Sequence, residues 1–351
     1  METLKIIIAG PCAAESQEQL FATAEALSNL NTEFMKTSKF DFHFFRAGIW
    51  KPRTSPDDFQ GVGIDAFEWL KLVKEKFGFS ICVEIASTEH ARLCIENGID
   101  AVWIGARTTV NPFLVQEIAD TVQHSSLTIL VKNPINPDLQ LWLGAIHRFQ
   151  NAGIKKIMAI HRGFSIENEN VFRNAPCWEI PIALRMKMPE TPILCDISHI
   201  AGNVSLQQLV AQTAINYGFS GLMAEVHYAP EKALSDSKQQ LLPSQFSHLL
   251  QTISFLSENN STDDALFILR NLIKGIDSQI GKLLSKRMEA VDEIATIKAL
   301  HAIPLLQPQQ WKKVVAVYEE NALKDENYYQ FLEEFLLLLH KASLKRQASC
   351  S

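Results

Sequence analysis

Three features that would mark a specialised class of protein are missing from this sequence. The net charge is −6, from 33 basic and 39 acidic residues, so the basic excess typical of nucleic-acid-binding proteins is absent. The longest apolar stretches, such as residues 335–339, are far too short to span a bilayer. Residues 1–10 carry no basic region followed by a long apolar core, so we expect no signal peptide. These absences predict that neither nucleic acid nor a membrane is a partner.

Cysteine is sparse and irregularly spaced. The chain has six cysteines in 351 residues, at positions 12, 82, 94, 177, 195 and 350, without the spacing of a disulfide framework. Cys82, Cys94 and Cys195 lie in apolar segments, which is typical of buried, reduced thiols. We therefore expect a cytoplasmic protein.

Short β-rich runs alternate with helix-like segments along the first 230 residues. Such alternation predicts a parallel sheet that is covered on both faces. Eight units in about 250 residues match the size of a (β/α)8 barrel. A doubly wound open sheet is the alternative, but no Gly-x-Gly-x-x-Gly motif follows the first strand. The predicted strands lie at residues 4–9, 43–49, 80–85, 101–106, 128–132, 156–161, 193–197 and 221–227.

The pattern changes after residue 242, where a helical period takes over. We predict a barrel domain over residues 1–256, a polar linker over 257–262 and an all-helical domain over 263–351. Apolar residues spaced three or four apart from 266 to 297 predict one long amphipathic helix, which two shorter helices follow. Because two short helices cannot cover the whole apolar stripe, we expect a homodimer, or a larger assembly, through this domain.

A stiff basic loop, Lys-Pro-Arg-Thr-Ser-Pro at residues 51–56, follows the second predicted strand. Its two prolines restrict the backbone, and a preorganised arginine can bind two oxygens at once, which suits phosphate or carboxylate recognition. Further cations follow other strands, where (β/α)8 enzymes have their active site. Their charges would repel one another unless a polyanionic ligand, with phosphates and a carboxylate, lay among them. The cations are Arg46, Lys51, Arg53, Arg107, Lys132 and Arg162.

A second group at the strand ends combines a thiol, an imidazole and two carboxylates: Cys12, His199, Glu225 and Asp236. These side chains form a ligand set suited to a divalent metal. Mixed sulfur, nitrogen and oxygen ligation leaves Mn, Fe, Co and Zn open, with Mn as the preferred ion. Such a metal would act as a Lewis acid on a carbonyl.

Short motifs recur in a consistent order over roughly residues 3–256. They are Ala-Gly-Pro-Cys at 9–12, the basic loop, Phe-Gln-Gly at 59–61, Ile-Gly-Ala-Arg at 104–107, Asp-Ile-Ser-His at 196–199, Ala-Glu-Val-His at 224–227 and Glu-Lys-Ala-Leu-Ser-Asp at 231–236. Together they resemble type I 3-deoxy-D-arabino-heptulosonate 7-phosphate (DAHP) synthase, in its short form without an N-terminal regulatory extension. The resemblance implies a metal-dependent condensation of phosphoenolpyruvate with erythrose 4-phosphate and water, the first step of the shikimate pathway.

The resemblance also implies a role for each group of residues. Cys12, Lys51 and His199 would take part in catalysis, in which the enol carbon of phosphoenolpyruvate attacks the aldehyde, water adds to C2 and phosphate leaves. Arg53 and Thr54 would bind the phosphate of the aldose. The metal would be held by Cys12, His199, Glu225 and Asp236. Phosphoenolpyruvate would be bound by Arg46, Lys51, Arg107, Lys132 and Arg162.

The chain departs from the family at a few positions, and two other barrel activities stay open. Ile197 stands where the family often has Pro, and Asn133-Pro134 where it has Arg-Gly. The sister enzyme 3-deoxy-D-manno-octulosonate 8-phosphate synthase typically has Lys-Ala-Asn-Arg-Thr-Ser in place of the basic loop, so the four-carbon aldose is favoured. A metal-dependent aldolase of another sugar pathway would not account for the helical domain.

Three cations lie on the predicted long helix. Arg287 and Lys298 are eleven positions apart, about three turns, so they share a face. Arg270 lies seventeen positions before Arg287 and points elsewhere, so it could reach the site of a partner chain. Together with Ser343 and Gln347, which are four apart on the last helix, this segment resembles the all-helical chorismate mutase class.

That second resemblance implies a dicarboxylate site for chorismate. Arg287, Lys298 and Gln347 would be catalytic, and Ser343 and the partner's Arg270 would help to bind the substrate. Cations would fix a chair-like conformer, and donors would stabilise charge that develops on the ether oxygen.

Two departures in this half motivate a second hypothesis. Gln310 and Trp311 stand where many members of the class have Arg and Glu. The helical domain could instead be a regulatory module that binds chorismate or prephenate with little catalysis of its own. In either case we expect feedback inhibition of the barrel by prephenate or chorismate through this domain.

Overall fold

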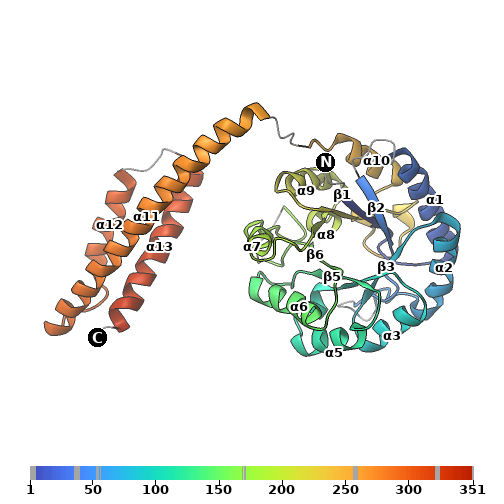
Figure 1. The fold of residues 1–351 in the computed structure, drawn as a ribbon, viewed down its shortest axis with the longest axis horizontal. Coiled ribbons are helices and arrows are strands. Elements are labelled where there is room, and N and C mark those ends of the chain that lie inside the picture. Colours follow the sequence, from blue (N-terminus) through green and yellow to red (C-terminus); the bar gives the residue numbers. More distant parts are fainter. Residues whose placement is uncertain are drawn as a thin grey trace. The chain divides into compact units, whose positions relative to one another are not determined.

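The computed structural model of this chain describes residues 5–34, 40–52, 55, 57–167, 169, 171–255, 260–320 and 325–349. The predicted site residues Arg53 and Thr54 lie outside the described residues, as do residues 257–259 of the predicted linker. The chain divides into two compact units, Met1–Leu256 and Ser257–Ser351. Figure 1 shows the first unit as strands ringed by helices and the second as long helices alone.

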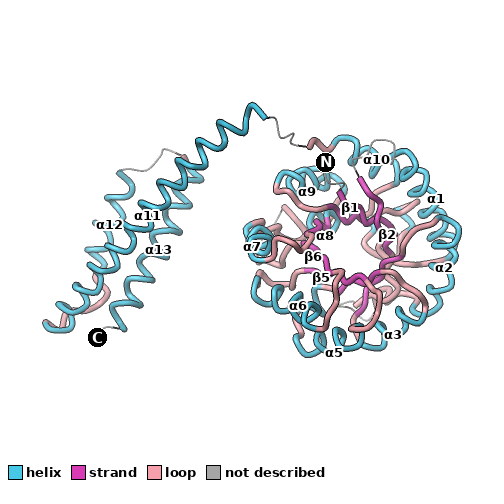
Figure 2. Tube along the Cα trace, in the orientation of Figure 1, coloured by secondary structure: helices cyan, strands magenta, loops and turns pink. Residues whose placement is uncertain are grey.

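Eight parallel strands close into a barrel in the first unit, in sequence order, with β8 returning to pair with β1. Figure 2 shows these strands in the middle of the unit and the helices around them. The closed ring confirms the (β/α)8 prediction and excludes the doubly wound sheet. The strands are β1 (Lys5–Gly10), β2 (Phe40–Arg46), β3 (Ile81–Ile85), β4 (Ala101–Ile104), β5 (Thr128–Lys132), β6 (Ile157–His161), β7 (Ile193–Asp196) and β8 (Gly221–Glu225).

Helices cover the outside of the barrel. At the start of several of them, an N-cap side chain accepts a hydrogen bond from a backbone N–H of the first turn that has no partner within the helix. Asn111, Asp138 and Asn203 each cap a helix in this way. The covering helices are α1 (Gln17–Phe34), α2 (Ala66–Phe77), α3 (Thr88–Glu96), α5 (Pro112–Val122), α6 (Leu139–Asn151), α7 (Glu179–Lys187), α9 (Val204–Asn216) and α10 (Pro243–Thr252). Two short helices follow strand ends, α4 (Ala106–Thr109) and α8 (Ile197–Ala201).

The second strand ends earlier than the sequence suggests. It runs over Phe40–Arg46, whereas the prediction placed it at residues 43–49. The backbone of Gly48 instead pairs with the segment after β1, where Ala14 N–H donates to the Gly48 carbonyl over 2.9 Å. A Cβ at Gly48 would lie 2.8 Å from the Cys12 carbonyl oxygen, so this close approach requires glycine. The pairing draws the residues after β2 toward Cys12.

The described part of the second unit forms three helices, α11 (Asn260–Leu300), α12 (Pro308–Glu320) and α13 (Glu326–Ser349), which confirms the all-helical prediction. Because α11 begins at Asn260, the last three residues of the predicted linker are helical. Helices α11 and α13 pack on each other through a small apolar core. The core residues are Val291, Ala295, Leu332, Leu336 and Leu339.

Large apolar side chains remain exposed along α11. They include Ile276, Ile280, Leu283, Ile294 and Ile297, each between 44% and 64% exposed. Exposed apolar residues that recur along one helix are typical of interaction surfaces. Among the residues that the structure describes, we find no helix with the length and apolar character to cross a bilayer.

Candidate active sites

The barrel site is a layer of side chains at the C-terminal ends of the strands. It lies next to a cluster of apolar side chains that fills the barrel interior, here called the plug. Successive side chains of a strand point to opposite faces, so positions two apart share a face. The plug includes Phe44, Cys82, Leu130, Leu194 and Met223. Two positions further along the same strands, at their C-terminal ends, lie polar residues in every case. These are Arg46, Glu84, Lys132, Asp196 and Glu225.

Two buried ion pairs organise this layer. Arg46 Nη2 lies 2.9 Å from Glu225 Oε1, and Lys132 Nζ lies 2.8 Å from Asp196 Oδ2. Both cations also lie over the ring of Trp103, at 5.0 and 5.5 Å from its centroid. Opposite charges offset the cost of burial here, because isolated buried charges are strongly unfavourable.

Asp196 orients His199 through the short helix α8. Its side chain caps this helix by accepting the His199 N–H, and it also lies 2.9 Å from His199 Nδ1. Burial alone would raise the pKa of Asp196, but His199 and Lys132 hold it well below its usual range. Burial lowers the pKa of His199 even though Asp196 opposes the shift. The neutral ring therefore donates from Nδ1, and Nε2 is the nitrogen with the lone pair.

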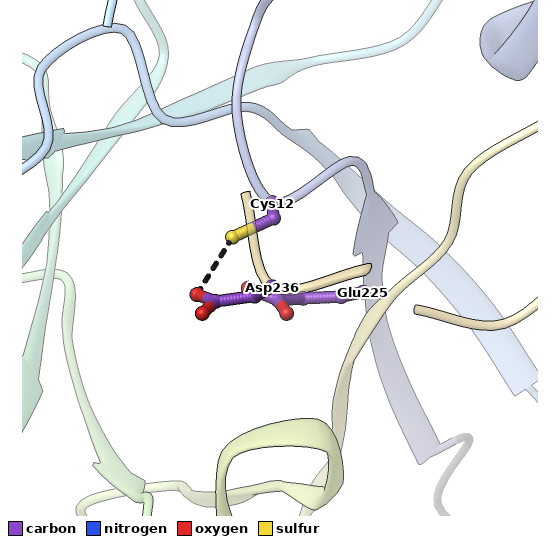
Figure 3. Close-up of side chains that lie close together, drawn as sticks. All are labelled: Cys12, Glu225 and Asp236. Atoms are coloured by element: carbon purple, nitrogen blue, oxygen red, sulfur yellow. Dashed lines mark hydrogen bonds between the residues drawn. The ribbon is translucent and has the colours of Figure 1, made fainter. Parts of the chain in front are cut away.

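Cys12, Glu225 and Asp236 come together at the ends of β1 and β8, where one ligand atom from each lies within 4.8 Å of the others (Figure 3). Cys12 Sγ lies 3.2 Å from Asp236 Oδ2, and His199 Nε2 lies 3.8 Å from Glu225 Oε1. Lys51 Nζ reaches the same place, 2.6 Å from Cys12 Sγ. Cys12, Glu225 and Asp236 thus form one cluster, and the fourth predicted ligand, His199, approaches it through Glu225.

The electrostatics of this cluster favour charged carboxylates. Burial and then Glu225 raise the pKa of the Cys12 thiol, whereas Lys51 opposes the rise. Burial would raise the pKa of Asp236, but Lys51 and Arg173 bring it below its usual range. Asp236 also adopts a left-handed backbone conformation, with φ of 49°, which is uncommon for non-glycine residues.

One cavity of about 500 Å³ collects most of the predicted cations at the barrel mouth. Arg162 is half-buried there, and its loss of solvent, together with nearby Arg173 and Arg107, lowers its pKa to about 10. Cations crowded in this way favour an anionic ligand, which would relieve their mutual repulsion. The predicted site residues that line the cavity are Arg46, Lys51, Arg107, Lys132, Arg162, His199 and Asp236.

Sequence reasoning missed Arg173 and Asn174, which also line the cavity. Arg173 Nη1 donates to Gln239 Oε1 over 2.5 Å and lies 3.3 Å from Asp236 Oδ1. Asn174 accepts from Arg162 Nη1 over 2.8 Å. Both follow β6 at a distance along the chain, and a bridge between Phe164 and Ala175 returns them to the site. The sequence offered one signal for these two residues: a basic side chain stands next to an amide side chain shortly before Pro176.

The helical unit brings together four of its five predicted site residues. Arg287 Nη1 donates to Ser343 Oγ over 2.7 Å. Lys298 Nζ donates to Gln347 Oε1 over 3.2 Å, and all but Arg287 are buried. Arg270 lies exposed on α11. Two pairs, each of a cation and a polar side chain, therefore lie between α11 and α13.

The barrel, its cationic mouth and the thiol, imidazole and carboxylate cluster define a (β/α)8 enzyme with a site for anionic ligands. The chain belongs to the DAHP synthetase I family, whose family model matches residues 2–260. The model of chorismate mutase type II matches residues 269–348. Both resemblances are confirmed, and the chain joins an enzyme domain of each family.

A relative and a solved structure agree with this assignment, and a more distant relative is named for the sister activity. A phospho-2-dehydro-3-deoxyheptonate aldolase of Thermotoga maritima is 32% identical over 252 residues, which are 72% of this chain and 70% of the relative. A crystal structure of the DAHP synthase from Thermotoga maritima aligns with a TM-score of 0.63 at 31% identity, over 76% of this chain and 71% of that one. A 2-dehydro-3-deoxyphosphooctonate aldolase of Helicobacter pylori (strain Shi470) is 25% identical over 268 residues, 70% of this chain and 92% of the relative.

Proposed function

We propose that the barrel condenses phosphoenolpyruvate with erythrose 4-phosphate and water to give DAHP and phosphate. The observation that carries this proposal is the cationic cavity beside the cluster of Cys12, His199, Glu225 and Asp236. Both substrates are anions, and the cavity gathers cations whose repulsion an anion relieves. The proposal places the reaction in the cytoplasm, where the buried thiols would stay reduced.

The cations hold and orient the two substrates in this account. Positioning accounts for much of the barrier in a reaction between two bound molecules, because both ends of the new bond are brought together. Lys51 Nζ, between Cys12 Sγ and Asp236 Oδ2, also places a positive charge where the cavity meets the cluster. Arg53 and Thr54 would bind the aldose phosphate. Phosphoenolpyruvate would be bound by Arg46, Lys51, Arg107, Lys132 and Arg162.

The donor set at the barrel mouth fits a divalent metal. Cys12, His199, Glu225 and Asp236 would hold it. The ligand atoms of Cys12, Glu225 and Asp236 are close together, and Asp196 turns His199 Nε2 toward Glu225. When bound, the metal would supply Lewis-acid polarisation of the aldehyde carbonyl. We propose Mn as the ion, with Fe, Co and Zn as alternatives that elemental analysis of the purified protein distinguishes.

The sister reaction is the alternative for the barrel, and the aldose distinguishes the two. Consumption of phosphoenolpyruvate with erythrose 4-phosphate, at a rate well above that with arabinose 5-phosphate, supports DAHP synthesis. Consumption with arabinose 5-phosphate alone would assign the barrel to octulosonate 8-phosphate synthesis. Product phosphate is measured in the same assays, since one phosphate leaves for each phosphoenolpyruvate consumed.

The helical unit is proposed to rearrange chorismate to prephenate. Arg287 and Lys298 would bind the two carboxylates, and Gln347 would stabilise charge that develops on the ether oxygen. The hydrogen bond from Lys298 to Gln347 Oε1 sets the orientation of that amide. Loss of chorismate absorbance with the purified protein tests this reaction.

We propose a homodimer through the exposed apolar face of α11, which includes Ile276, Ile280 and Leu283. The partner's Arg270 would complete each helical site.

Feedback inhibition by prephenate is proposed to act through this unit. The alternative, a purely regulatory unit, is supported if prephenate inhibits the barrel while chorismate is not turned over. Deleting residues 257–351 should abolish the inhibition, and retained sensitivity would contradict a role for this unit.

A further inference from the structure

His340 on α13 lies close enough to Arg287 and Lys298 for their charges to act on it, although the proposed rearrangement makes no use of it. Its ring stacks on Trp311 of α12, with centroids 4.2 Å apart and 29° between the planes. Positions 340, 343 and 347 are spaced by three and four residues, so they share one face of α13. His340 is therefore on the face that carries Ser343 and Gln347, the two polar partners of the site cations.

The stack with Trp311 fixes the place of the imidazole. Two flat rings in van der Waals contact restrict the rotation of each other's side chains. Trp311 stands where many members of the mutase class have Glu, and an indole cannot supply the negative charge of a carboxylate. In this chain a titratable ring, supported by an aromatic surface, therefore lies near the position of that carboxylate.

The charges that act on His340 come from α11. Burial first, and then Arg287 and Lys298, lower the pKa of His340. In the described part of the helical unit these two cations act on the ring from α11, and Trp311 covers it from α12. The ring is therefore neutral near pH 7 while no anion occupies the site.

We infer that His340, held by Trp311, contacts the ligand of the helical site and that an anionic ligand binds there together with a proton on His340. The inference rests on the proposed role of this site in binding a dicarboxylate. Ligand carboxylates would offset the field of Arg287 and Lys298, so the imidazolium is no longer repelled and both its N–H groups can donate. The proton comes from solvent, and no covalent bond changes.

Calorimetric titration of the full-length protein with prephenate tests this inference. At one pH near 7.5, the binding enthalpy in phosphate and in Tris buffer should differ, because the two buffers release protons with different enthalpies. The difference should correspond to uptake of up to about one proton per site, and Kd should fall by up to about tenfold per pH unit as the pH is lowered. His340→Gln should bind with the same enthalpy in both buffers. His248→Gln, an exposed histidine of the barrel unit, should behave as the unchanged protein does.

The possible results distinguish failure of this inference from failure of the proposed function. Uptake that persists in His340→Gln overturns the inference, and so does binding of prephenate to the unchanged protein with equal enthalpies in both buffers. If prephenate does not bind and chorismate is not turned over, the proposed function of the helical unit fails as well. NMR titration of the His340 ring in the unchanged protein, with and without prephenate, needs no variant, and a pKa that prephenate does not raise also contradicts the inference.

Discussion

Arg46 and Glu225 form an ion pair across the end of β1, with Arg46 Nη2 2.9 Å from Glu225 Oε1 and side chains that are 1% and 0% exposed. The strand between β2 and β8 contributes Gly10 at this level, where a Cβ would lie 2.2 Å from the Arg46 carbonyl oxygen. Glycine therefore allows the two neighbouring strands to bring their charged ends together. The pair connects Arg46, which is proposed to bind phosphoenolpyruvate, to Glu225, which is proposed to hold the metal.

Removal of the Arg46 charge should destabilise the barrel. Arg46→Met would leave the Glu225 carboxylate buried without this partner, which costs about 3–5 kcal/mol. Urea unfolding followed by tryptophan fluorescence measures the change. Arg92→Met, which breaks the exposed pair with Glu89, is the matched control. A loss in Arg46→Met as small as that of an exposed pair, about 0.5 kcal/mol, would contradict this account.

Arg173 is expected to position Asp236 for metal binding. Arg173→Gln removes the cation beside Asp236 Oδ1, so the carboxylate is held less firmly. Metal affinity should fall about 10–100-fold, as is usual when a group behind a metal ligand is lost. Competition with a chromophoric chelator measures this without any activity assay. Arg185→Gln, at the end of α7, is the control, and equal affinities in the two variants would count against the role.

His161 should make stability depend on pH. Burial lowers its pKa to about 3, whereas the unfolded chain has an ordinary pKa near 6.5. The unfolded state therefore binds one more proton between these values, so the stability contributed by the neutral ring is complete above pH 6.5 and is lost as the pH falls. The loss amounts to about 1.4 kcal/mol per pH unit.

Urea unfolding at pH 5 and pH 7 tests this prediction through His161→Phe. The ring lies among Trp142, Trp178 and Phe219, so an aromatic replacement can occupy the space. Titrating groups elsewhere affect both proteins alike, so the variant should lose less stability than the unchanged protein on going from pH 7 to pH 5. Equal losses would show that His161 does not carry the effect.

Gln347 should matter for chorismate turnover and not for the barrel reaction. Gln347→Ala removes the proposed donor to the ether oxygen, and kcat should fall by about 10²–10³-fold. Gln330→Ala, an exposed glutamine on the same helix, should leave turnover unchanged. A Gln347→Ala enzyme that retains full activity would remove this residue from the mechanism.

The sequence predicted the barrel and much of its site for physical reasons that can be named. Regular alternation of apolar strands and helices identified all eight strands, and their C-terminal ends supplied Lys132 and Glu225. The end of β2 was wrong because the backbone of Gly48 pairs with the segment after Cys12, a long-range contact without a local signal.

Residues contributed by irregular segments could not be predicted in this way. Arg173 belongs to the long connection between β6 and α7, so no strand period places it at the barrel mouth. His340 has no special position on α13 by itself. Trp311, which stacks on its ring, and Lys298, whose charge lowers its pKa, come from two other helices, so only the packing relates them to His340.

Phosphoenolpyruvate consumption with erythrose 4-phosphate, before and after treatment with EDTA and then with added Mn²⁺, tests the central claim most directly. We predict that chelation abolishes consumption and that Mn²⁺ restores it, while Cys12→Ser weakens the restoration. Undiminished consumption in EDTA, or consumption only with arabinose 5-phosphate, would contradict a metal-dependent DAHP synthase built on this cluster.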